Sequence, residues 1–186
     1  MRRLDSGSKR QIYIHIGEYH VSRRPEIIST VVGSCVAVCL FDADSGIAGM
    51  NHILLPGSIG MADFSISAKY GMNAMELLIA KMMKLGADRN KIIAKAFGGA
   101  CTLSAMDSKN HIGKKNADFV VKFLEKEGLK LSSCSLGGVM GRKVNFHTDT
   151  GSVFIKRIIP SAIKSVVDEE KKKGSTILSS KIREII

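Results

Sequence analysis

The chain has 186 residues, of which 45% are apolar and 5% aromatic, and it carries a formal net charge of +11 at pH 7. This length and apolar content fit one globular domain with a sizeable core, and the presence of only 3 prolines argues against long disordered linkers. The positive charge favours anionic partners. Much of it lies near the two ends of the chain, where charge is usually solvated, so we predict no nucleic-acid partner.

The N-terminal segment gives no sign of export. Residues 1–10 are charged and polar with no apolar stretch behind them, and no apolar run approaches the ~20 residues that span a bilayer. We therefore expect a cytoplasmic protein. In that reducing compartment we expect the cysteines to remain free thiols. They are Cys35, Cys39, Cys101 and Cys134.

The first third of the chain predicts strands. Alternating or continuous apolar residues indicate strands over 12–16, 19–21, 26–32, 36–41 and 47–55. A Gly33-Ser34 break separates the third strand from the fourth, and the loop 42–46 joins the fourth to the fifth as a hairpin. Pro56-Gly57 ends the fifth strand, and a loop is expected over 57–67.

The remainder alternates helices and strands. Apolar stripes and glycine stops predict helices over 68–85 and 112–127, strands over 91–97 and 129–135, a loop over 100–110, a hairpin of 143–147 with 152–158, and a short helix over 161–173. Strands that come in hairpins favour an α+β fold, a mixed β-sheet sandwich flanked by helices, over a doubly wound parallel sheet. We expect a flexible basic tail over 1–10, one domain over 11–160 and a charged extension over 161–186.

Cys35 is the first candidate for chemistry. It follows Gly33-Ser34 between two apolar runs. A Gly-Ser step there allows a sharp turn that presents Cys35 at the end of a sheet, with Gly33 and Ser34 forming an elbow whose backbone N–H groups can stabilise an oxyanion. The alternative is a β-bulge that carries a buried, inert cysteine.

A thiol nucleophile with an ordinary pKa of about 8.5 needs a base. Among 5 histidines, His52 is preferred because it and Cys35 flank the loop 42–46 almost symmetrically, so antiparallel pairing brings them together. A third group should orient the imidazole. No Asp or Glu is suitably placed, and Ser29 and Thr30, on the strand that enters the elbow, are both candidates.

Metal binding by Cys35, Cys39 and His52 is the competing interpretation. The two thiols would lie roughly 13 Å apart along an extended strand, too far for one zinc ion, so we predict no metal and no cofactor. Gly98-Gly99 and Gly137-Gly138 match no phosphate-binding motif and are interpreted as tight turns that wall a site. Gly98, Gly99 and Arg142 are the candidates for a substrate groove. A basic rim is expected from Lys114, Lys115, Arg142 and Lys143.

With these residues identified, the chain resembles the CheD family of chemoreceptor glutamine deamidases. Two segments carry the resemblance, 30–40 (TVVGSCVAVCL) and 49–56 (GMNHILLP). Weaker support comes from 98–100 (GGA), 110–116 (NHIGKKN) and 137–142 (GGVMGR). The similarity runs in order from about residue 17 to 158.

The resemblance implies a protein-glutamine glutaminase that converts Gln side chains of methyl-accepting chemotaxis receptors to Glu. By position, Cys35 is then the nucleophile and His52 the base. The family's third residue is a threonine before the elbow, a place that both Ser29 and Thr30 fit. The implied fold is similar to the catalytic domain of cytotoxic necrotizing factor, and the implied partners are the receptors and the phosphatase CheC. A non-catalytic binding module, a nucleic-acid binder and a receptor methylesterase are the alternatives.

Overall fold

The computed structural model describes residues 9–55, 64–101 and 112–159, with the side chains of the first helix from Gly71 onward. The strands are β1 (Arg10–Tyr13), β2 (Tyr19–Ser22), β3 (Glu26–Val32), β4 (Val36–Asp42), β5 (Ile47–Ile53), β6 (Ile93–Gly98), β7 (Lys130–Leu136), β8 (Gly141–His147) and β9 (Val153–Ile158). The helices are α1 (Phe64–Lys84), the short 3₁₀ helix η2 (Arg89–Lys91) and α2 (Ile112–Lys126).

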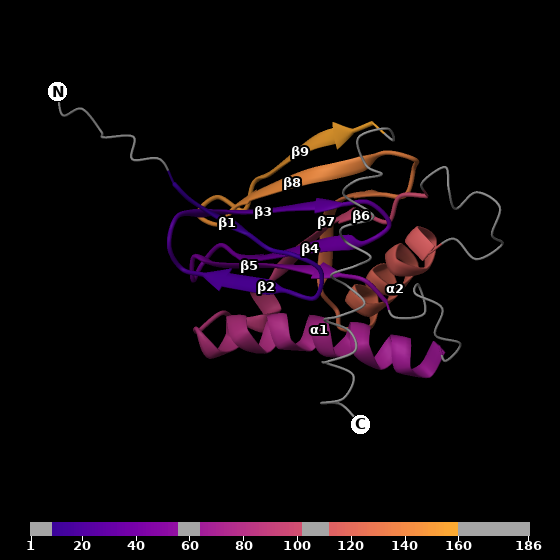
Figure 1. Ribbon diagram of the computed structural model, residues 1–186. Helices are drawn as coiled ribbons and strands as arrows, with labels where there is room; N and C mark the ends of the chain where they lie inside the picture. Colours follow the sequence, from indigo (N-terminus) through magenta and orange to yellow (C-terminus); the bar gives the residue numbers. More distant parts are fainter. Residues whose placement is uncertain (1–8, 56–63, 102–111, 160–186) are drawn as a thin grey trace.

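The strands form two mixed sheets that face each other. One has four strands in the order β1-β3-β8-β9, and the other has five in the order β2-β5-β4-β6-β7. Each sheet contains one parallel pair, β1 with β3 and β6 with β7. Helices α1 and α2 cover the outer face of the five-stranded sheet (Figure 1). The predicted α+β sandwich with flanking helices is confirmed.

The two sheets and the helices form three layers, and an apolar core lies between each pair of neighbouring layers. The core between the sheets includes Ile28, Val32, Cys39, Met50, Val144 and Phe146. The core between the five-stranded sheet and the helices includes Val38, Leu40, Ile53, Leu78, Met82, Val120 and Leu124. Strand β4 lies between β5 and β6 and is buried at all seven positions, which explains why its sequence is apolar without alternation.

Several predicted boundaries are wrong. The first strand covers 10–13 rather than 12–16, although Ile14 and Ile16 are buried as expected. The strand predicted from residue 91 begins at Ile93, because Asp88 caps the 3₁₀ turn by accepting a bond from the backbone N–H of Asn90. Helix α1 begins at Phe64, four residues before its predicted start. The predicted helix over 161–173, the C-terminal extension, residues 1–8 of the tail and nearly all of the 100–110 loop lie outside the described residues.

Among the described helices, none is long and apolar enough to cross a membrane.

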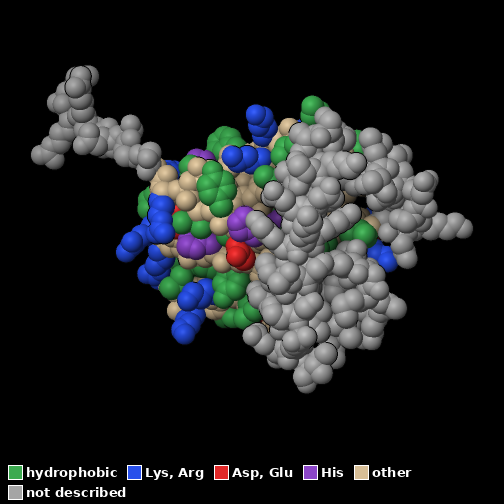
Figure 2. Space-filling view, viewed as in Figure 1, with side chains coloured by type: hydrophobic (Ala, Val, Ile, Leu, Met, Phe, Trp, Pro, Cys, Tyr) green, Lys and Arg blue, Asp and Glu red, His purple; other side chains and the backbone are tan. Residues whose placement is uncertain are grey.

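Exposed basic side chains gather at the end of the sandwich where β1 begins and β2 ends (Figure 2). Arg10, Arg23 and Arg24 lie there.

Candidate active site

Cys35 lies where the chain passes from one sheet to the other. Strand β3 belongs to the four-stranded sheet and β4 to the five-stranded sheet, so residues 33–35 form the link between the two layers. All three carbonyl oxygens of this link accept hydrogen bonds. The donors are the N–H of Ala100 to Gly33 (2.8 Å), the side-chain amide of Asn116 to Ser34 (2.8 Å) and the N–H of Gly99 to Cys35 (2.7 Å).

These bonds also fix the direction of the amide groups. In a trans peptide the C=O of one residue and the N–H of the next point in opposite directions, and the described chain has no cis peptide. The N–H groups of Ser34 and Cys35 therefore point away from the Gly99–Ala100 segment and from α2. This is the arrangement that can offer an N–H donor beside a nucleophile.

The close approach of two backbones explains Gly98. Its φ is 123°, and a Cβ there would collide with the carbonyl oxygen of Cys35. Gly113, in the first turn of α2, approaches this segment as closely, because a Cβ at that position would meet the carbonyl oxygens of Gly99 and Ala100. Gly98 and Gly99 thus form a wall directly behind the elbow.

The predicted antiparallel hairpin of β4 and β5 is confirmed. In its register Val36 faces Ile53 and Ala37 faces His52. Cys35 precedes Val36 by one residue, which makes His52 its diagonal neighbour. Such neighbours on one face lie about 7–8 Å apart and are within reach of a large side chain. Cys35 belongs to the core between the sheets, the same side on which His52 meets Thr30.

Thr30 reaches His52 from the opposite sheet. Its Oγ1 lies 2.8 Å from Nδ1 of His52 and donates to the carbonyl oxygen of Ile14 at 2.8 Å. A hydroxyl has one proton, so with that proton on Ile14 the bond to His52 must run from Nδ1–H to Oγ1. This pairing favours the tautomer protonated at Nδ1 and leaves the basic lone pair on Nε2.

Ser29 lies on the other face of β3. Its hydroxyl donates to Asn145 Oδ1 at 2.8 Å and accepts from Gln11 Nε2 at 2.9 Å. Both partners belong to strands of the same four-stranded sheet, so this network lies on the face turned away from His52. Of the two candidates for the third site residue, only Thr30 contacts the imidazole.

His52 is held firmly and is almost dry. Its backbone N–H donates to the carbonyl of Glu18 and its carbonyl accepts from Gly17, and 2% of the residue is exposed. Burial, assisted by the charge of nearby His15, lowers the pKa of His52 to about 3. The imidazole is therefore neutral at physiological pH, with one ring nitrogen unprotonated.

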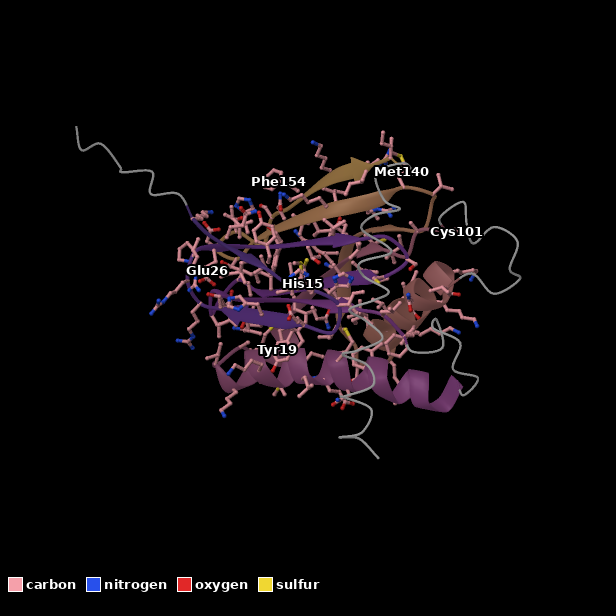
Figure 3. The ribbon with its side chains drawn as sticks, in the orientation of Figure 1. His15, Tyr19, Glu26, Cys101, Met140 and Phe154 are labelled. Carbon is pink, nitrogen blue, oxygen red and sulfur yellow. The ribbon has the colours of Figure 1, made fainter. Side chains whose placement is uncertain are left out.

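His15 itself is exposed, in the segment between β1 and β2 (Figure 3). Its electrostatic effect on His52 indicates that a second imidazole lies near the buried one. The predicted strand over 12–16 placed His15 between Ile14 and Ile16, whereas in the structure β1 ends at Tyr13 and His15 follows it.

Arg142, a candidate for the substrate groove, is 7% exposed and binds backbone. Its guanidinium donates to the carbonyls of Gly98, Gly137 and Met140 and to the hydroxyl of Ser135. Burial lowers the pKa of Arg142, with a smaller contribution from Arg157. Arg142 thus ties together the loops that wall the elbow.

The predicted basic rim is dispersed. Lys114 is exposed and pairs with Asp118, while Lys143 lies over the ring of Tyr13 on the four-stranded sheet. An open pocket of about 440 Å³ borders the glycine wall and is lined in part by Gly99, Cys101, Lys114 and Gly138. Of the four residues predicted to form the rim, Lys114 lines this pocket.

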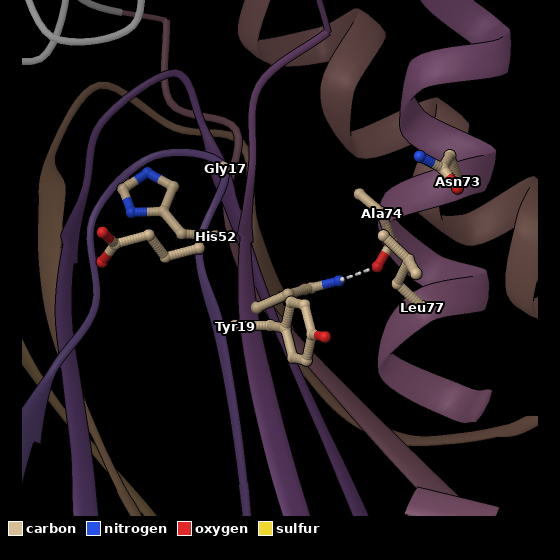
Figure 4. A pocket seen from close by; sticks show the side chains of 8 residues that line it. Gly17, Tyr19, His52, Asn73, Ala74 and Leu77 are labelled. Atoms are coloured by element: carbon tan, nitrogen blue, oxygen red, sulfur yellow. Dashed lines mark hydrogen bonds between the residues drawn. The ribbon is translucent and has the colours of Figure 1, made fainter. Parts of the chain in front are cut away.

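A second, small cavity of about 30 Å³ lies beside the backbone of His52, between β5 and α1 (Figure 4). Gly17, Asn51 and Ala74 are among its lining residues, and Asn51 donates to the carbonyl of Ala74 at 3.2 Å. This volume holds one or two water molecules. It is too small for a glutamine side chain.

Within the described residues, no three His, Cys, Asp or Glu side chains are close enough together to hold a metal ion. The sequence reasoning missed Asn116, whose side chain bonds both Ser34 and the backbone N–H of Leu55. A signal was available, because Asn116 precedes Val120 by four residues and therefore lies on the apolar face of its helix.

The chain is similar in sequence to a family of known proteins. The family model described as CheD chemotactic sensory transduction matches residues 54–157. The chain is 44% identical over 142 residues to the probable chemoreceptor glutamine deamidase CheD 1 of Dechloromonas aromatica, covering 76% of this chain and 70% of that one. It is 47% identical over 137 residues to the protein of the same name from Ruegeria sp., with coverages of 73% and 71%. The probable deamidase CheD 2 of Chromobacterium violaceum is 41% identical over 162 residues, covering 87% and 80%.

Two solved structures are more distantly similar, each with a TM-score of 0.41. They are the hypothetical protein YfiH of Bacillus licheniformis, at 12% identity with 63% of this chain and 49% of that chain covered, and a Neisseria meningitidis protein of family DUF152, at 11% identity with 70% and 63% covered. The family model covers more than half of the 186 residues, and three relatives exceed 40% identity over most of their length. The chain belongs to the CheD family.

Proposed function

We propose that the protein is a protein-glutamine deamidase that converts glutamine side chains of chemotaxis receptors to glutamate and releases ammonia. In this proposal Cys35 is the nucleophile, His52 the general base and Thr30 the residue that orients His52. The observation that carries it is the contact between Thr30 Oγ1 and His52 Nδ1, on the face of β5 that also adjoins Cys35. The relatives named as probable chemoreceptor glutamine deamidases support the substrate.

The first half of the reaction forms a thioester. Nε2 of His52 takes the proton of the Cys35 thiol as sulfur attacks the carboxamide carbon of the glutamine. His52 is neutral before this step, because burial lowers its pKa to about 3. Proton transfer is therefore expected to accompany attack. His52 then gives the proton to the departing nitrogen, and ammonia leaves.

The second half hydrolyses the thioester. Neutral His52 takes a proton from water, the hydroxide adds to the thioester carbon, and the thiol of Cys35 leaves with the proton. The sum is one amide and one water converted to one carboxylic acid and one ammonia. Thr30 holds Nδ1–H through both halves, so the basic lone pair stays on the nitrogen that faces the reaction.

Both halves place negative charge on the carbonyl oxygen of the substrate. The backbone N–H groups of Ser34 and Cys35 are the proposed donors to it. The carbonyls of Gly33 and Ser34 are bonded on the opposite side, to Ala100 and Asn116, which supports the required direction of the amides. Gly98 and Gly99 hold the elbow from behind, and Arg142 holds the loops that carry these glycines.

The proposed substrate is the cytoplasmic part of a chemoreceptor, and a cytoplasmic location is part of this proposal. The catalytic domain is assigned to residues 11–160, with the charged terminal segments outside it. CheC is a proposed partner. In the cell, the reaction would change the number of negative charges on receptor helices and so contribute to chemotactic adaptation.

Mass spectrometry of receptor cytoplasmic fragments tests the proposal. Incubation with the protein is expected to increase the mass of specific glutamine-containing peptides by about 1 Da, the change from amide to acid. The Cys35→Ala protein should give no increase. An unchanged mass with the wild-type protein, or an equal increase with Cys35→Ala, would contradict the proposal. Release of methanol from methylated receptors would reveal methylesterase activity instead.

A further inference from the structure

Asn116 joins the two chain segments that carry the proposed nucleophile and base. Its Nδ2 donates to the carbonyl of Ser34, the residue before Cys35, at 2.8 Å. Its Oδ1 accepts from the N–H of Leu55, three residues after His52, at 3.1 Å. These partners are 82 and 61 residues away in the sequence. One side chain therefore bridges the end of β5 and the elbow.

The environment of Asn116 makes this bridge rigid. The residue is completely buried, on the face of α2 that also carries Val120, and a buried amide without partners is strongly unfavourable. Its carboxamide uses both ends, a donor toward Ser34 and an acceptor toward Leu55. Helix α2 lies close to the elbow, since a Cβ at Gly113 would collide with the carbonyl oxygens of Gly99 and Ala100. The helix thus delivers a fixed amide to the junction.

The bond to Ser34 has a directional consequence. The Ser34 carbonyl and the Cys35 N–H belong to one planar peptide, so fixing the carbonyl fixes the N–H. Rotation of this peptide would turn the proposed oxyanion donor and change the position of the Cys35 side chain relative to His52. Small displacements of this kind have large effects on reaction rates.

From this geometry we infer that Asn116 is a positioning residue, which sets the Cys35 peptide against the strand of His52 through its bonds to Ser34 and Leu55. It touches neither the substrate nor the reacting atoms. The inference rests on the proposed deamidase function for its kinetic readout. The reactivity of the Cys35 thiol toward a small alkylating reagent gives a second readout that requires no receptor.

The experiment compares Asn116→Ala with a matched control, Thr148→Val. Thr148 is also buried, and its hydroxyl bonds the backbone of Glu26 and Arg24. Glu26 begins β3, whereas the elbow follows the other end of that strand; Glu26 and Cys101 lie at opposite ends of the sandwich (Figure 3). Both variants lose buried hydrogen bonds, but only one lies beside the elbow.

The experiment uses the whole chain. It measures kcat and KM on a receptor fragment, and Tm. It also measures the pH profile of Cys35 alkylation by iodoacetamide, which peptide mass spectrometry follows at that residue. Asn116→Ala is expected to lower kcat about 10- to 100-fold with KM changed less than about threefold, and to alter the alkylation rate of Cys35 across the profile. Thr148→Val should lower Tm and leave kcat and alkylation close to wild type.

Asn116→Asp is the second variant if the alanine protein does not fold. It keeps an acceptor for Leu55 and, when ionised, lacks a donor for Ser34, so it should also lose kcat. A folded variant at residue 116 with wild-type kcat and alkylation would overturn the inference, as would an equal loss of kcat in Thr148→Val. If wild type does not deamidate receptors but Asn116→Ala still changes Cys35 alkylation, the proposed function fails and the positioning role stands.

Discussion

Cys35 and Cys39 offer a comparison within one short stretch of chain. Both lie in the core between the sheets, and they are 2% and 1% exposed. Cys39 sits in the middle of β4, where its register partners are Met50 on β5 and Lys95 on β6. Cys35 precedes β4, in the link between the sheets, with His52 as its diagonal neighbour.

The two thiols are equally buried but differ in their surroundings. Burial raises the pKa of Cys39 far above its ordinary value, and the charge of Lys95 offsets this only in part. A thiol in that position stays protonated. At Cys35 the strand is interrupted, the carbonyls are bonded on one side, and an imidazole lies next to the position. In the proposed mechanism, the break in the backbone before β4 distinguishes Cys35 from Cys39.

Replacing the two cysteines should give the largest contrast. Cys35→Ala is expected to lower deamidation of receptor fragments by at least about 10⁴-fold, because it removes the sulfur that forms the proposed thioester. Cys39→Ala should remain within about threefold of wild type and lose some stability, since it removes one buried sulfur. Ammonia release and Tm are the measurements. Comparable losses of activity in both variants would remove the distinction between the two positions.

The two hydroxyls of β3 provide the next test. Thr30→Val keeps the shape of the side chain but removes the acceptor for His52 Nδ1, and we expect kcat to fall roughly 100-fold. Thr30→Ser should restore much of it. Ser29→Ala removes the bonds to Gln11 and Asn145 on the other face and should change kcat little. A greater loss in Ser29→Ala would show that the wrong face of the strand was assigned to the site.

The glycine behind the elbow should affect stability. Gly98→Ala places a Cβ against the Cys35 carbonyl at a positive φ, and we expect a loss of about 1–3 kcal/mol in the free energy of unfolding. Gly46→Ala is the control, because its φ is +67° but nothing lies within 4 Å of the added Cβ. Its loss should be about 1 kcal/mol. Urea unfolding measures both, and equal losses would show that contact with the elbow adds nothing.

The dependence of stability on pH provides a test of the buried imidazole. The pKa of His52 is about 3 in the folded state and about 6.5 when unfolded. Between these values the unfolded chain binds the extra proton, so stability is fully present above pH 6.5 and falls as the pH drops toward 3. The slope approaches about 1.4 kcal/mol per pH unit. His52→Asn should show a shallower decline in urea unfolding from pH 6.5 to 4.5. An identical slope would contradict a buried neutral imidazole.

Local patterns in the sequence were sufficient for much of the fold. Strand β3 has its predicted bounds, and the hairpin of β4 and β5 follows from two apolar runs around a short loop. The choice between Ser29 and Thr30 could not be made in this way. Strand β3 is apolar on both faces, with Ile27 and Val31 on one and Ile28 and Val32 on the other, so alternation did not indicate which face meets the second sheet.

Contacts between distant segments were also beyond the reach of the sequence. Helical spacing places Asn116 on the apolar face of α2, but its partners Ser34 and Leu55 become neighbours only when the helix packs on the sheet. The short 3₁₀ turn before β6 depends on the side chain of Asp88, which local hydrophobicity does not register. In both cases a single polar side chain makes hydrogen bonds that the apolar pattern does not predict.

The link at residues 33–35 joins two sheets and is bonded to a helix, so it belongs to no single layer. Thr30 comes from one sheet and His52 from the other. Neither sheet by itself contains a complete site, and no fragment of the chain would be expected to work. As denaturant is added, activity should disappear at the first loosening of the layers, before secondary structure is lost, so that catalysis reports whether the whole sandwich is closed.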